Sequence, residues 1–121
     1  MSKEKMSYKE KLKNQILENY PYEFTLDEEH PFMHSRAWRF DLAIVKLKIA
    51  IEYDGLIFKP EQQRGGHQTP KGMINDMEKR NEAQIRGWLV LIANQVSIKD
   101  FTFIEQLERA IKVRKGDIRY E

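Results

Sequence analysis

The chain has 121 residues, of which 40% are hydrophobic and 33% are charged, so we expect one domain spanning 1–121 with a modest core. Cysteine is absent, which excludes disulfides, thiolate metal sites and cysteine nucleophiles, and fits a reducing cytoplasmic compartment. The start of the chain lacks the apolar block of a secretory signal, and we find no apolar run long enough for a membrane span. The net charge of +2 does not by itself indicate a nucleic-acid partner.

The first predicted element is a helix that runs from Ser7 to Tyr20 and stops at Pro21. Ser7 and Glu10 have the spacing of a capping box. Apolar side chains recur on one face of this helix, at Tyr8, Leu12 and Ile16. The next segment, YEFTL at 22–26, favours a short strand, and DEEHPFMHSR at 27–36 favours a polar loop.

Two longer strands are predicted at 37–45 and 48–54, because both segments are rich in branched and aromatic residues. They pair as a hairpin around Lys46 and Leu47. One face of this hairpin is expected to lie against the core, and it carries Trp38, Phe40, Leu42, Ile44, Ile49, Ile51 and Tyr53.

After a loop, a second helix is predicted from Pro70, with Thr69 as its N-cap and Gly87 as its C-cap. Its apolar spacing involves Ile74, Met77, Asn81 and Ile85. The segment WLVLIA at 88–93 predicts a strand buried on both faces. A last helix is expected from Asp100 or Thr102, the latter with Glu105 as a second capping box. The order helix, three strands, helix, strand, helix indicates an α/β domain with a small mixed sheet, since the second helix allows a parallel crossover.

The hairpin register places Asp41 directly opposite Glu52, on the face away from the core, with Asp54 nearby. Like charges that face each other across two strands are destabilising, and a divalent cation with oxygen ligands would compensate. The alternative is an ordinary solvated strand face on which Arg39 forms a salt bridge with Asp54.

The segments RAWRFDLAIVKLKIAIEYDG (36–55) and GGHQTPKGMINDMEKRNEAQIRGWLVLIAN (65–94) resemble the PD-(D/E)XK nuclease superfamily. The likeness is greatest to its compact branch of phage-type Holliday junction resolvases and proteins related to the very-short-patch-repair endonuclease, and it covers roughly 36–95. The resemblance implies a restriction-endonuclease-like core and a metal-dependent endodeoxyribonuclease.

In this resemblance, Asp41 and Glu52 hold Mg²⁺, for which Mn²⁺ can substitute, and the main-chain carbonyl of Tyr53 is a further ligand. The first helix often adds an acidic residue in this superfamily. We favour Glu18, since Glu10 has the capping role, and Glu23 is a third option. The motif position usually held by lysine is Asp54 here, which the resemblance implies as a second-metal ligand. The basic group must then come from elsewhere, and its candidates are Lys79, Lys71 and His67.

The loop at 55–71 is basic, and its glycines allow backbone amides to approach a phosphate. Its DNA-binding candidates are Lys59, Arg64, His67 and Lys71. We therefore expect a homodimer that cleaves four-way DNA junctions, because cutting two opposed strands requires two active sites. The alternatives are a mismatch- or restriction-type nicking endonuclease and a non-catalytic DNA-binding subunit on the same fold.

Overall fold

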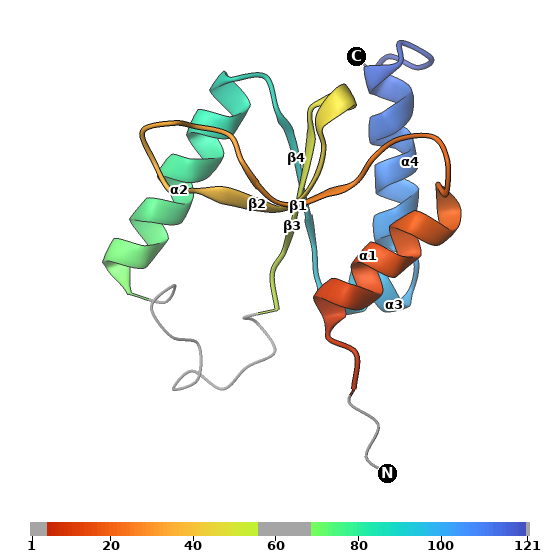
Figure 1. Ribbon diagram of the computed structural model, residues 1–121, viewed down its shortest axis with the longest axis horizontal. Helices are drawn as coiled ribbons and strands as arrows, with labels where there is room; N and C mark the ends of the chain where they lie inside the picture. Colours follow the sequence, from red (N-terminus) through yellow and green to blue (C-terminus); the bar gives the residue numbers. More distant parts are fainter. Residues whose placement is uncertain (1–4, 56–68, 121) are drawn as a thin grey trace.

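A four-stranded mixed sheet runs through the centre of the structure, a computed structural model that describes residues 5–55 and 69–120 (Figure 1). Its elements follow in the order α1 (Tyr8–Asn19), β1 (Asp27–Pro31), β2 (Arg39–Ile44), the 3-10 helix η1 (Val45–Leu47), β3 (Ile49–Tyr53), α2 (Pro70–Ile85), β4 (Leu89–Ala93), α3 (Gln95–Lys99) and α4 (Thr102–Arg114). The predicted α/β class is therefore confirmed.

The strands lie in the order β1-β2-β3-β4. Strand β2 is antiparallel to both β1 and β3, and β4 is parallel to β3. Helix α2 provides the crossover to the parallel strand, as predicted. It covers one face of the sheet, while α1, α3 and α4 gather on the other (Figure 1).

The hairpin of β2 and β3 has the predicted register. Leu42 pairs with Ile51, Ala43 with Ala50, and Ile44 with Ile49. The alternating pattern of these strands sends their branched side chains towards α1 and α4, and their alanines towards α2. The larger core cluster consequently contains Leu12, Ile16, Leu42, Ile44, Ile49, Ile51, Phe103 and Leu107 among others.

A second, smaller core lies on the α2 face, and it contains Phe40, Ala43, Ala50, Ala83 and Trp88. The prediction that Phe40 shares a face with Leu42 is therefore wrong. The alternation breaks at Asp41, where the β1–β2 register is interrupted: Leu42 pairs with Glu28 and Phe40 with His30, but the residues between them are not paired. Glu29 has a φ of 49°, in the left-handed region, and this local twist lets Phe40 stack on Phe32 and contact Trp88 edge-on.

The first strand lies at Asp27–Pro31 and not at 22–26 as predicted. Strand β1 is at the edge of the sheet, where polar side chains are tolerated because one side of the strand has no partner. Phe24 and Leu26 pack against the larger core from the connection before it, so their apolar character serves packing outside the sheet.

The apolar residues whose spacing predicted this helix do not lie on its buried face, because Ile74, Met77 and Ile85 are exposed. The helix packs through Ala83 instead, whose small side chain fits against Phe40 and Trp88. Its N-terminal end is as predicted, since the Thr69 hydroxyl accepts the N–H of Gly72. The C-cap residue is Arg86 and not Gly87 as predicted; Gly87 follows it with a φ of 89°.

At the C-terminal side, β4 is an edge strand with Ile92 exposed, so the expected burial on both faces is wrong. Helix α4 begins at Thr102, but its N-cap residue is Phe101. The Asp100 carboxylate accepts both the N–H and the hydroxyl of Thr102, which replaces the predicted Thr102–Glu105 capping box. None of the helices within the described ranges is long and apolar enough to cross a membrane.

Candidate functional site

Asp41 and Glu52 meet where the β2–β3 ladder ends, directly beyond the Leu42–Ile51 pair. The backbone N–H of Asp41 donates to the Glu52 carboxylate at 3.1 Å, and the N–H of Tyr53 donates to the Asp41 carboxylate at 2.8 Å. Each carboxylate is thus anchored to the backbone of the opposite strand. The structure brings together the two acidic residues that the hairpin register paired. The prediction that they lie on a face away from the core is wrong, because helices cover both faces of the sheet and the two side chains are only 19 and 17% exposed.

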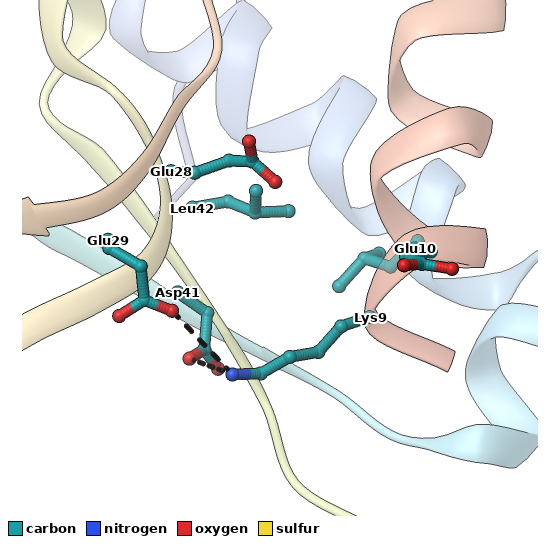
Figure 2. A pocket seen from close by; sticks show the side chains of 7 residues that line it. Lys9, Glu10, Glu28, Glu29, Asp41 and Leu42 are labelled. Carbon is teal, nitrogen blue, oxygen red and sulfur yellow. Dashed lines mark ion pairs between the residues drawn. The ribbon is translucent and has the colours of Figure 1, made fainter. Parts of the chain in front are cut away.

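Lys9 reaches this pair from the first turn of α1 (Figure 2). Its ammonium lies 2.8 Å from a carboxylate oxygen of Asp41 and 3.8 Å from one of Glu29. The hydrogen bond to Asp41 raises the pKa of Lys9, against the lowering effect of its partial burial. Sequence analysis missed Lys9, because no local pattern in one helix indicates which strand its side chain will contact.

Lys79 contacts the Glu52 carboxylate from α2, on the other side of the sheet. Only 19% of the Lys79 side chain and 17% of the Glu52 side chain are exposed, so this is a mostly desolvated ion pair. Burial raises the pKa of Glu52 above its ordinary value, although the hydrogen bond from Lys79 acts to lower it. Of the three candidates for the basic group, Lys79 therefore lies in contact with one of the two acidic residues.

A hollow of about 230 Å³ lies between α1 and the strands β1 and β2, next to Asp41 (Figure 2). It is lined by Lys9, Glu10, Leu12, Glu28, Glu29, Asp41 and Leu42. The acidic residue that α1 contributes here is Glu10, whose N–H is bonded to the Ser7 hydroxyl. Glu18, which we had favoured, lies exposed in the last turn of α1 and is not among the lining residues.

The other predicted site residues have varied positions. The N–H of Asp54 donates to the Ala93 carbonyl at 2.8 Å and so extends the parallel ladder. The Tyr53 ring stacks on Tyr8, with ring centroids 6.2 Å apart. Lys71 is exposed in the first turn of α2 and lines a different hollow. Three of the DNA-binding candidates lie outside the described residues, namely Lys59, Arg64 and His67.

Two further residues weighed in the sequence analysis, Arg39 and Glu23, contact groups outside the Asp41–Glu52 pair. Arg39 donates to the backbone carbonyl of Glu29 at 3.3 Å. Glu23, the third acidic candidate, forms an ion pair with Lys115 at 3.7 Å. It therefore contacts the C-terminal end of α4 instead of the Asp41–Glu52 pair.

The oxygen ligands of the acidic pair suit a hard cation that needs only one or two protein carboxylates. Within 5–55 and 69–120, no group of three histidine, aspartate or glutamate side chains is arranged to hold a metal, so the predicted patch of three carboxylates is not formed there. Mg²⁺ commonly binds through only one or two carboxylates, completed by water and phosphate oxygens. Asp41 and Glu52, with the Tyr53 carbonyl, fit that kind of ligand set.

Comparison of this chain with models of known protein families, with curated proteins and with solved structures gave no match.

Proposed function

We propose that the protein is an Mg²⁺-dependent DNA endonuclease of the PD-(D/E)XK type. The observation that carries the proposal is the meeting of Asp41 and Glu52 at the open end of the hairpin, each anchored to the opposite strand. Two adjacent carboxylates on rigid strands are what a metal-dependent hydrolase requires, because their position must not depend on the metal being present.

In this proposal, Asp41, Glu52 and the Tyr53 carbonyl hold the cation. When bound, Mg²⁺ acidifies water and neutralises charge on the phosphate. Lys79 takes over the task of the usual motif lysine, since that position is Asp54 here. Its ammonium already lies beside Glu52, from where it can contact a phosphate oxygen next to the cation. Lys9 would act in the same way beside Asp41.

The preference for four-way junctions and the homodimer rest on the sequence resemblance. A junction-cleaving enzyme needs two sites related by symmetry, which a homodimer supplies. Mismatch or restriction-type nicking is the nearest alternative within the same class. DNA binding itself would depend on Lys59, Arg64, His67 and Lys71.

A non-catalytic DNA-binding subunit is a second candidate, and one observation favours it. Asp41 and Glu52 each have a lysine partner, and these ion pairs offset the repulsion between the two carboxylates without any metal. The discriminating property is therefore hydrolysis, since both candidates predict DNA binding.

The test is to incubate labelled linear duplex, mismatched duplex and four-way junction with the protein and Mg²⁺, and to size the products. The endonuclease predicts cleavage by the wild type, and loss of cleavage with retained DNA binding in Asp41→Asn and Glu52→Gln. Glu108→Gln, which changes an exposed carboxylate of α4, is the matched control and should cleave normally. A wild type that binds DNA but cleaves none of the three substrates, with Mg²⁺ or Mn²⁺, supports the non-catalytic subunit.

A further inference from the structure

Helix α2 presents an apolar stripe to solvent. Met73, Ile74, Met77 and Ile85 have exposed fractions of 45, 55, 58 and 76%. Met73, Ile74 and Met77 follow Pro70 by three, four and seven residues, and Ile85 follows Met77 by eight, so that all lie along one side of the helix. The polar residue Asn81 lies on the same side, between Met77 and Ile85. On a helix of a monomeric protein this side would face the core.

The sheet covers the opposite side of α2. Gly72, Asp76, Lys79 and Ala83 are the partly or fully buried positions there, and Lys79 is occupied by its contact with Glu52. In Figure 1, α2 is the only described helix on its side of the sheet. The connection between β1 and β2 lies beside it, and there Arg36 and Trp38 both donate to the Asn75 side chain. The amphipathic helix is thus inverted, with its small and polar side against the sheet and its large apolar side outward.

We propose that this stripe packs against the same stripe of a second copy of this chain, with the two α2 helices antiparallel about a two-fold axis near Met77. In such a pair, each residue of the N-terminal half meets a residue of the partner's C-terminal half. The proposal goes beyond the nuclease function and does not depend on it, because it rests on α2 alone.

The charges beside the stripe suit an antiparallel pair of identical helices. Lys71, Glu78 and Glu82 lie on one flank, at spacings of seven and four residues, with the basic residue at the N-terminal end and the acidic residues in the C-terminal half. With the two-fold axis between Asp76 and Met77, Lys71 of one copy comes opposite Glu82 of the other, and the contact occurs twice. Glu82 is also paired with Arg86 of its own helix, at 3.3 Å, so Lys71 would join that ion pair.

The surface near the start of α2 also offers space for the end of the partner's helix. A hollow of about 480 Å³ is lined by Thr69, Lys71, Gly72, Ile74, Asn75 and Glu78. In the antiparallel arrangement this end of one helix meets the C-terminal end of the other, where Ile85 is the most exposed member of the stripe. If the Ile85 side chain of each copy entered this hollow of the other copy, both isoleucines would be removed from water.

Sedimentation equilibrium of the whole chain, without DNA or metal, tests the proposal separately from catalysis. We expect a dimer for the wild type and at least tenfold weaker association for Met77→Glu, which brings two negative charges together at the two-fold axis. Tyr22→Glu is the control, since Tyr22 is 95% exposed and far from α2 in sequence, and it should dimerise normally. A monomeric wild type, or a Met77→Glu variant that dimerises as the wild type does, would overturn the proposal.

Charge reversal tests the antiparallel register. Lys71→Glu alone and Glu82→Lys alone should each weaken the homodimer, because each creates two repulsive contacts. An equimolar mixture of the two variants should associate better than either variant alone, since both contacts of the mixed dimer are then attractive. Circular dichroism confirms that each variant is folded. If the mixture associates no better than the separate variants, the proposed register is wrong.

Discussion

Asp41 and Glu52 are tied to each other's strands by side chain–backbone hydrogen bonds, at the position where the β2–β3 ladder would otherwise continue. Beyond the Leu42–Ile51 pair, the hydrogen bonds between the two strands are thus accepted by side-chain carboxylates in place of backbone carbonyls. This arrangement holds two carboxylates together through contacts that need no cation. Two lysines from helices on opposite faces of the sheet offset the charges of the carboxylates: Lys9 pairs with Asp41, and Lys79 pairs with Glu52.

Mg²⁺ should raise the melting temperature of the wild type, because an ion that binds only the folded state stabilises it. At ten times its Kd such a ligand contributes roughly 1.4 kcal/mol. Differential scanning fluorimetry over millimolar Mg²⁺ measures the shift. Asp41→Asn should show a much smaller shift, and an equal shift in wild type and variant would place the ion elsewhere.

Replacing Lys79 with methionine should destabilise the fold by about 1–3 kcal/mol, because it leaves the Glu52 carboxylate desolvated and without its ammonium partner. Burial already raises the pKa of Glu52, and the loss of Lys79 raises it further. The charged form is therefore the costly one, so the penalty is present above this pKa and is relieved as the pH falls through it.

Urea unfolding of Lys79→Met in chelator-containing buffer at pH 8 and pH 5 measures this effect. The loss relative to wild type should be larger at pH 8. Adding Glu52→Gln to Lys79→Met should recover part of the loss at pH 8, since it removes the unpaired charge. A loss that is the same at both pH values would contradict the assignment to Glu52.

Lys9→Gln should behave differently from Lys79→Met. About half of the Lys9 side chain is exposed, so its ion pair with Asp41 is screened and is worth less than about 1 kcal/mol. The variant removes a cation that competes for the Asp41 carboxylate, and Mg²⁺ should therefore bind it more tightly. Isothermal titration calorimetry compares the two proteins, and weaker Mg²⁺ binding by Lys9→Gln would count against Asp41 as a ligand.

Asp100→Asn should remove a pH-dependent contribution to stability. The hydroxyl of Thr102, and next its N–H, hold the pKa of Asp100 below the ordinary value. A lowered folded-state pKa stabilises the fold above the unfolded-state pKa, and this contribution is lost as the pH falls through the folded-state value. The amide oxygen of asparagine accepts the same bonds at every pH. The stability difference measured by urea unfolding at pH 7 should accordingly shrink at pH 3.

Local patterns in the sequence predicted what depends on neighbouring residues. The register of the hairpin follows from the alternation in β2 and β3, which is why the meeting of Asp41 and Glu52 could be predicted. The outward face of α2 could not, because helical spacing identifies a side of the helix without indicating which side the sheet covers. Strand β1 has the composition of a loop, since an edge strand needs few apolar residues. Lys9 is separated from Asp41 by the whole first strand, so only the fold brings them together.

Arg114 connects three parts of the chain at the closed end of the hairpin. Its guanidinium donates to the carbonyls of Lys48, at 3.2 Å, and Gly87, at 2.7 Å, while the Lys48 ammonium donates to the Arg86 carbonyl at 2.7 Å. The hairpin turn, the end of α2 and the end of α4 are therefore fastened to one another. The two ends of the hairpin are thus held by different means: by backbone carbonyls and two basic side chains at the turn, and by the two carboxylates at the other end. Backbone amides at the turn should therefore exchange slowly with deuterium even when the carboxylates are replaced.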